Sequence, residues 1–195
     1  MKKYFTLLLL FISPLTMAIT QQELISKLQK PQSIQGDFIQ QRFLKALKNP
    51  IKTSGQFTLV AEKGLLWQMK TPFENNLRVT SKGIMQYNGT AWVGNNNNFA
   101  QQQQIQLFLG LLSGDISTLK QQFDLKLTGE KSAWQLDLIP NSFLMKQIFN
   151  IIRLQGSEVV KKIILDEKQG DKTVIQFENI QINSPLSFFT QQALN

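Results

Sequence analysis

Acid–base or covalent chemistry in this chain would depend on carboxylates and lysines, because the sequence contains no His and no Cys. Without His there is no imidazole base, no Ser-His-Asp triad and no His-ligated metal. Without Cys there is no thiol nucleophile, disulfide or thiolate metal site. The 13 acidic residues are scattered singly, except for Asp166 and Glu167, which precede a turn at Gly170. The sequence therefore predicts a protein that is not an enzyme and uses no cofactor or metal, with a carboxylate hydrolase as the weaker alternative.

The N-terminal segment has the pattern of a secretory signal peptide. Lys2 and Lys3 precede an apolar run over 4–12 that is too short to span a bilayer. Small residues lie one and three positions before a cleavage point after Ala18. We therefore expect residues 1–18 to be removed and residues 19–195 to act in the periplasm of a bacterium.

The charge of the chain favours acidic surfaces but not nucleic acid. The formal net charge is +8, yet the lysines are dispersed and the longest basic run is Lys161-Lys162. Nucleic-acid binding needs a concentrated basic stripe, whereas a dispersed charge favours encounter with membrane lipid or glycolipid headgroups. No interface pattern is evident, so we expect a monomer that does not bind nucleic acid.

The hydrophobic periodicity predicts a β-rich domain with a few helices. Thr20 and Glu23 form a capping pattern at the start of a helix over 20–30. From Ser33 to Val93, and again from Phe123 to Ile182, apolar residues alternate with polar ones between Gly turns, which is typical of antiparallel strands. Between these regions, an amide-rich tract over 95–104 is predicted to be a loop ahead of helices over 105–112 and 116–122.

These elements fit one domain over 19–195, because no linker or change of composition interrupts the pattern. About ten antiparallel strands must pair into a sandwich or curl into a barrel, since a single flat sheet of that width is rare. Helices with a broad apolar face need a sheet surface to cover, and the concave side of a curled sheet provides one.

Several short motifs together resemble the periplasmic outer-membrane lipoprotein carrier family, LolA. They are the run 34–40 (IQGDFIQ), Gly55-Gln56-Phe57, Gly64-Leu65-Leu66-Trp67 with Pro72 five residues later, and Val79-Thr80-Ser81-Lys82-Gly83 with Tyr87. The apolar helix ending at Leu112 and the run 136–140 (LDLIP) are also similar. None of these motifs is catalytic.

The resemblance implies a mainly β fold: a half-open, strongly curved antiparallel sheet, or incomplete barrel, with a short helical lid. It also implies an apolar cavity that shields the acyl chains of a lipoprotein or lipid during transport toward the outer membrane. The implied partners are an inner-membrane release complex and an outer-membrane acceptor. A non-transport module that senses envelope lipids or proteins is the alternative function.

Strand parity selects the candidate lipid-binding residues. The concave face is predicted to carry Phe57, Leu59, Ala61, Leu65, Trp67 and Met69, and the lid to contribute Phe108, Leu109 and Leu112. The alternative is that these residues are simply core, because a small β protein needs most of its large apolar side chains for packing.

Two departures from the family pattern concern the lid and the C-terminus. Lipoprotein carriers have an inner Arg on the third strand that bonds the lid, and the matching position here, six residues before Trp67, is Ala61. The carriers end in an extra helix and strand, whereas this sequence stops soon after Phe189. We therefore expect a weakly held lid and a cargo other than the usual triacylated lipoprotein, such as a glycolipid or polyketide-like lipid.

Overall fold

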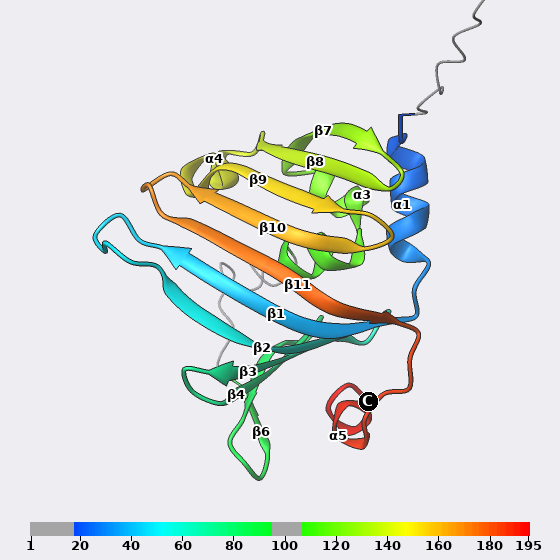
Figure 1. Cartoon of the computed structure of the whole chain (residues 1–195), viewed down its shortest axis with the longest axis vertical. Helices are drawn as coiled ribbons and strands as arrows, with labels where there is room; N and C mark the ends of the chain where they lie inside the picture. The colour runs from blue at the N-terminus through cyan, green and yellow to red at the C-terminus, as the bar shows by residue number, and fades with distance from the viewer. Residues whose placement is uncertain (1–17, 95–106) are drawn as a thin grey trace, which may run out of the picture.

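The computed structural model describes residues 18–94 and 107–195, which form one curved antiparallel sheet of eleven strands with short helices (Figure 1). The strand order is β6-β5-β4-β3-β2-β1-β11-β10-β9-β8-β7, and the sheet is open rather than closed into a barrel. This confirms the mainly β, half-open sheet. The predicted loop over 95–104 and nearly all of the predicted signal peptide lie outside the described residues.

Two antiparallel meanders meet in the middle of the sheet. The first contains β1 (Ser33–Phe43), β2 (Ile51–Val60), β3 (Gly64–Thr71), β4 (Asn75–Thr80), β5 (Gly83–Tyr87) and β6 (Trp92–Gly94). The second contains β7 (Phe123–Glu130), β8 (Ala133–Pro140), β9 (Phe149–Gly156), β10 (Val160–Glu167) and β11 (Lys172–Ile182). Strand β1 pairs with β11, which brings Phe38 opposite Phe177 and joins the two meanders into one sheet.

The concave face of this sheet carries the main hydrophobic core. Alternate residues of β8 are buried, among them Trp134, Leu136 and Leu138, and their neighbours Gln135 and Asp137 are half-buried. The helix α1 (Gln21–Gln29), the helical residues 107–113 and α3 (Ile116–Lys120) pack against this face. The predicted helices over 20–30 and 116–122 are thus confirmed, and no helix of the described residues is long and apolar enough to cross a bilayer.

Two further helices were not predicted from the sequence. The helix α4 (Phe143–Ile148) lies between β8 and β9, and α5 (Phe188–Ala193) follows β11. Each begins after a serine, Ser142 or Ser187, whose hydroxyl accepts a hydrogen bond from a backbone N–H of the first turn. The contrast drawn with the extra helix and strand of the carriers is therefore wrong as regards the helix, because α5 follows the last strand.

The helix α5 covers a separate apolar cluster on the outer face of the sheet, apart from α1 and α3 (Figure 1). Leu66 and Leu194 are buried there, with Phe189 and Trp92 packed against them. The guanidinium of Arg78 lies 5.0 Å from the Trp92 ring centroid and donates a 3.0 Å hydrogen bond to the Ala193 carbonyl. A cation at this end of a helix compensates its unpaired carbonyl groups.

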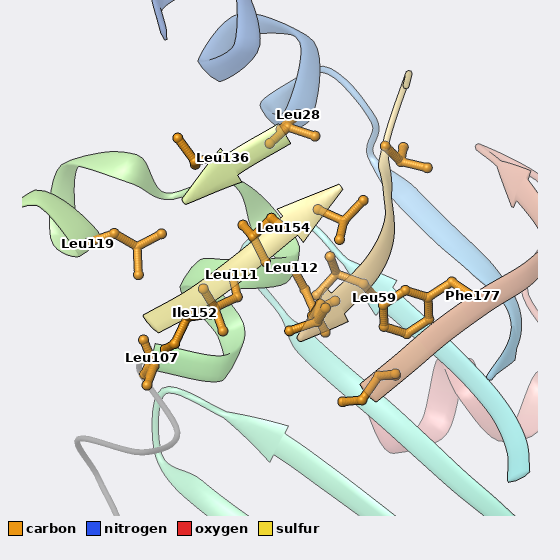
Figure 2. Packing of buried hydrophobic residues seen from close by; sticks show 14 of the residues in the cluster. Leu28, Leu59, Leu107, Leu111, Leu112, Leu119, Leu136, Ile152, Leu154 and Phe177 are labelled. Atoms are coloured by element: carbon orange, nitrogen blue, oxygen red, sulfur yellow. The ribbon is translucent and has the colours of Figure 1, made fainter. Parts of the chain in front are cut away.

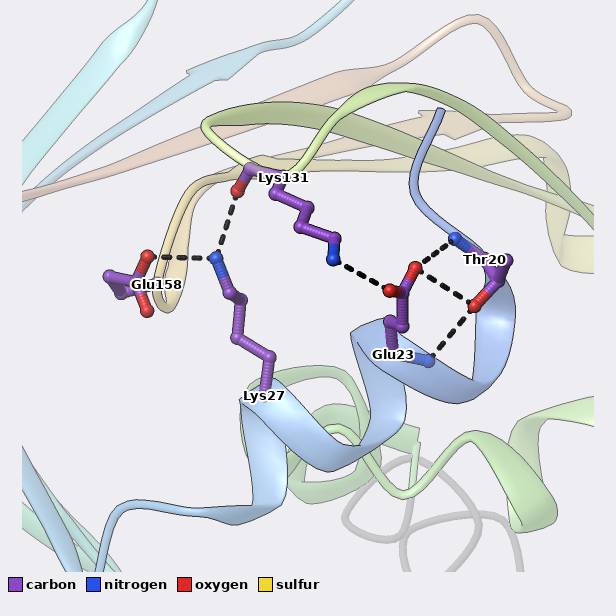
Figure 3. Close-up of polar contacts among 5 residues, drawn as sticks. All are labelled: Thr20, Glu23, Lys27, Lys131 and Glu158. Atoms are coloured by element: carbon purple, nitrogen blue, oxygen red, sulfur yellow. Dashed lines mark hydrogen bonds and ion pairs between the residues drawn. The ribbon is translucent and has the colours of Figure 1, made fainter. Parts of the chain in front are cut away.

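The start of α1 is tied to the β7–β8 turn by a polar cluster (Figure 3). The backbone N–H of Glu23 donates to the Thr20 hydroxyl (3.2 Å), and the backbone N–H of Thr20 donates to the Glu23 carboxylate (3.0 Å). The Lys131 ammonium lies 2.7 Å from the same carboxylate, and Lys27 pairs with Glu158 at 2.7 Å. The predicted capping box is therefore present, and it is extended by ion pairs to two turns of the sheet.

Glu23 should make the stability of the fold dependent on acid pH. The Lys131 side chain, followed by hydrogen bonds from Thr20, lowers the pKa of Glu23 from 4.5 to about 2. Because the pKa is lower in the folded state, the ionised carboxylate stabilises that state above about pH 4.5, and this contribution is lost as the pH falls toward 2. We expect Glu23→Gln to lower the melting temperature at pH 7 and to differ less from wild type as the pH approaches 2.

The control for this measurement is Glu74→Gln, an exposed carboxylate in the β3–β4 turn that has no ion pair among the described residues. Melting temperatures are measured by circular dichroism across the acid range. A gap between Glu23→Gln and wild type that stays constant down to pH 2 would contradict the assignment.

Candidate lipid-binding face

The predicted strand residues lie together on the concave face. Phe57 is paired with Trp67, and Leu59 with Leu65, so that each pair shares one side of the sheet. Phe57, Leu59, Leu65 and Trp67 are all at most 9% exposed, and Met69 packs against the same cluster. Strand parity therefore identified the correct face for these five residues.

The helical residues 107–113 cover this face as the predicted lid would. Leu107, Leu111 and Leu112 are buried, and Phe108 and Leu109 are half-buried against the core. Figure 2 shows Leu107, Leu111 and Leu112 gathered with side chains from β8, β9, β11 and β2 in one apolar layer. The structure thus brings all eight candidate residues into a single cluster.

The end of the lid is fixed by a tight turn against α1. Gly114 has φ +68°, and an added Cβ would lie 2.4 Å from the Leu28 Cβ, so the backbone approaches α1 too closely for a side chain. Asp115 then caps α3, and a hydrogen bond from Ser117 is the main reason that the pKa of Asp115 is lowered. The lid is therefore anchored firmly at its C-terminal end.

Aromatic contacts join the lid to the sheet. The Trp67 ring stacks on Phe38 with centroids 3.7 Å apart, and its edge contacts Phe108 of the lid at 5.7 Å and Phe177 at 6.3 Å. These rings fill the space between the lid and the sheet. In this closed arrangement the candidate residues serve as core, and cargo would have to displace the lid contacts.

A pocket of about 530 Å³ opens where the lid meets the end of the β2–β3 hairpin. Its apolar wall contains Leu28, Ile34, Leu59 and Leu109, and its polar residues include Gln29, Gln32, Glu62 and Lys63. Its volume lies in the range of about 300–1,000 Å³ that is usual for ligand pockets. The pocket therefore adjoins the concave face through Leu59 and the lid through Leu109.

Ala61 lies at this pocket rather than on a strand. It follows β2 in the turn that leads to β3, and its backbone N–H donates a 2.9 Å hydrogen bond to the Gln32 carbonyl. The prediction that strand parity places Ala61 on the concave face is wrong, because the strand ends at Val60 and the alternation stops there. Ala61 nevertheless lines the pocket together with the lid residues Leu109 and Ser113.

A second hollow, of about 610 Å³, has a lining of mixed polar and apolar residues. It lies at the β7–β8 and β9–β10 turns and is lined by residues such as Gln135, Gln155 and Lys162. None of the eight candidate residues lines this hollow, although Phe177 of the aromatic cluster does. In the described part of the chain, no three acidic residues come together as a group that could hold a metal ion.

Phe38 and Phe177 belong to the aromatic cluster but were not selected from the sequence. Phe38 is fully buried and Phe177 is 5% exposed. Both occupy alternating positions in strands that had been predicted, so the period-two pattern contained the signal. Phe38 reaches Trp67 through the β1–β2 and β2–β3 pairings. Phe177 is brought there by the pairing of β1 with β11, which the sequence did not show.

Comparison with known proteins identifies the family. The model of the family described as "Outer membrane lipoprotein carrier protein LolA" matches residues 29–189, which is most of the chain. The chain belongs to the LolA family. The resemblance inferred from the strand and turn motifs is therefore confirmed.

Curated relatives of this LolA-family chain are distant. Proteins named "Outer-membrane lipoprotein carrier protein" from two strains of Coxiella burnetii, RSA 331 and RSA 493, are each 26% identical over 139 residues. These matches cover 70% of this chain and 64% of each relative. The matched part thus spans somewhat less than two thirds of the length of the relatives.

Solved structures with low sequence identity support the fold. A LolA superfamily protein from Nitrosomonas europaea is 10% identical with a TM-score of 0.50, covering 91% of this chain and 98% of its own. The MucA/MucB complex of Pseudomonas aeruginosa contains a chain 15% identical with a TM-score of 0.50, covering 88% of this chain and 58% of its own. At these identities the likeness is one of architecture.

Proposed function

We propose that this chain is a periplasmic carrier that shields the acyl chains of a lipoprotein or lipid on its concave face and delivers them toward the outer membrane. The observation that carries the proposal is the contact between Phe108 of the lid and Trp67 of the sheet, next to an apolar-walled pocket. A lid that contacts the sheet through apolar side chains can be displaced by a competing apolar group.

The energetics favour exchange between lid and cargo. Each methylene that leaves water contributes about 0.8 kcal/mol, so an acyl chain on the concave face can compensate for the lid contacts that it displaces. Phe108 and Leu109 are only half-buried in the closed state, and they are the lid residues that face solvent most easily. The candidate residues would therefore act as core in the empty protein and as cargo contacts in the loaded one.

The location and partners form part of the same proposal. Cleavage after Ala18 would leave Ile19 as the first residue, and Ile19 is 6% exposed in the core with its N–H donating to the Gly129 carbonyl. A carrier of this kind would receive cargo from a release complex at the inner membrane and transfer it to an acceptor at the outer membrane. It would act as a monomer and without catalysis.

The experiment that tests the function is native mass spectrometry of protein purified from the periplasm. A carrier should retain a lipid or an acylated peptide, and its mass identifies the cargo class. Protein that is free of lipid, and that also fails to bind a hydrophobic dye, would exclude the carrier. It would leave the sensing module, which recognises its target without extracting it.

Phe108→Glu should weaken binding at the concave face. A carboxylate placed against Trp67 would have to be desolvated when an apolar ligand binds beside it, so we expect about tenfold weaker dye binding and less co-purified lipid. The control is Phe188→Glu on α5, because Phe188 is 75% exposed and lies outside the concave face. Equal loss in both variants would contradict the assignment of the lid.

A further inference from the structure

Three segments that are far apart in the sequence form one rim of the molecule, on the left in Figure 1. They are the β1–β2 hairpin end (residues 43–52), α4 (Phe143–Ile148) and the β10–β11 turn (residues 167–172). The backbone N–H of Lys168 donates to the Ile148 carbonyl (2.9 Å), and that of Lys45 donates to the Asp171 carboxylate (3.0 Å). These contacts hold the three segments side by side, and we call them the basic rim.

The basic rim exposes several large apolar side chains. Phe143 is 81% exposed, whereas Met145 on the same helix is 2% exposed and anchors α4 to the core. Six of the large hydrophobic side chains that are exposed in this structure lie here: Phe43, Leu47, Ile51, Phe143, Leu144 and Ile148. Single exposed apolar residues are ordinary on a protein surface. A contiguous apolar patch indicates a surface that binds a membrane or another molecule.

The charge of the basic rim identifies what would cover it. Six exposed lysines are interleaved with the apolar residues: Lys45, Lys48, Lys52, Lys146, Lys168 and Lys172. The two acidic residues of the rim, Glu167 and Asp171, are about 15% exposed and lie within 4 Å of the Arg42 guanidinium. The basic rim therefore presents lysine ammonium groups around its exposed apolar side chains, which we call the apolar tips. Its two carboxylates are largely buried and lie beside Arg42.

We propose that the basic rim docks on an anionic lipid bilayer. Apolar tips surrounded by lysines fit a membrane interface, because the tips enter the boundary between headgroups and acyl chains while the ammonium groups remain at the phosphates. Each lysine near an anionic surface adds favourable attraction that salt weakens. A protein partner would need acidic groups matched to one geometry, whereas a bilayer accepts the dispersed lysines seen here.

Docking at the rim would leave the cargo pocket unobstructed. Strand β2 runs from Ile51 in the rim to Val60 at the pocket, so the two sites lie at opposite ends of the same strand. The inference adds a membrane-approach step to the proposed carrier, but it does not require cargo. Failure of one proposal can therefore be distinguished from failure of the other.

The test is co-sedimentation of the full chain with vesicles of phosphatidylethanolamine and phosphatidylglycerol, compared with vesicles of phosphatidylcholine. We expect binding to the anionic vesicles that weakens with salt. The triple variant Lys48→Gln, Lys146→Gln, Lys168→Gln should bind at least tenfold more weakly, whereas the matched triple Lys30→Gln, Lys126→Gln, Lys161→Gln should bind nearly as well as wild type. All six lysines are exposed, so the two triples change the net charge equally.

The apolar tips are tested by Phe143→Asn, with Phe188→Asn on α5 as the control, because both phenylalanines are at least 75% exposed. Phe143→Asn should weaken vesicle binding several-fold and leave dye binding unchanged, while Phe188→Asn changes neither. The proposal is overturned if wild type ignores anionic vesicles, which would assign the rim to a protein partner. Equal losses in the two lysine triples, or no effect of Phe143→Asn, would also overturn it.

Discussion

Replacing Trp67 by alanine is expected to lower the free energy of unfolding by about 3–5 kcal/mol, the usual cost of removing a large aromatic side chain from a core. Trp67 is 9% exposed and contacts Phe38, Phe57, Phe108 and Phe177, so no other side chain can fill its volume without a rearrangement of the lid. The measurement is urea unfolding of the protein without lipid, followed by circular dichroism.

The matched control is Trp92→Ala, which removes the same side chain from the cluster under α5 on the outer face. Trp92 is only half-buried, so its loss should cost less than that of Trp67. A cost for Trp67→Ala below about 1 kcal/mol would contradict the placement of Trp67 in the packed core, because three of its four aromatic contacts come from the sheet itself.

Introducing an arginine at Ala61 is expected to slow the uptake of a hydrophobic dye. Ala61 lines the same pocket as Leu109 and Ser113, so a guanidinium there can donate to backbone carbonyls of the lid. Hydrogen bonds of a charged group contribute about 1.5–3 kcal/mol, which lowers the open fraction roughly 10- to 150-fold. Stopped-flow dye fluorescence measures the change in the rate of uptake.

Ala61→Met provides the control, because methionine fills a comparable part of the pocket and has no hydrogen-bond donor. The backbone bond from Ala61 to Gln32 is independent of the side chain, so both variants should fold. If the two substitutions slow uptake equally, the effect is one of filling the pocket, and the latch explanation is discarded.

Much of the fold could be predicted because its signals are local. Alternation of apolar residues located the strands, and Thr20 with Glu23 located the start of α1. The short helices α4 and α5 escaped prediction, and the sequence markers at their starts are the caps Ser142 and Ser187. Helices of this length depend on packing rather than on propensity.

The candidate site was predictable only as far as each strand remained regular. Parity placed Phe57 and Trp67 correctly, since they oppose each other in a continuous hairpin. It failed at Ala61, where the hairpin turns. The contribution of Phe177 could not be foreseen, because it depends on which strands become neighbours, and that is decided by the packing of the whole sheet rather than by any one segment.

The pairing of β1 with β11 has a consequence for how the chain is made. Gln35 and Gln181 lie side by side in the sheet but are 146 positions apart in the sequence. While the chain emerges, β1 keeps one edge unpaired until β11, the last strand of the sheet, has appeared, and unpaired edges recruit strands from other chains. Contacts over such separations also form slowly. The nascent protein therefore depends on being kept apart from other copies until β1 has paired with β11.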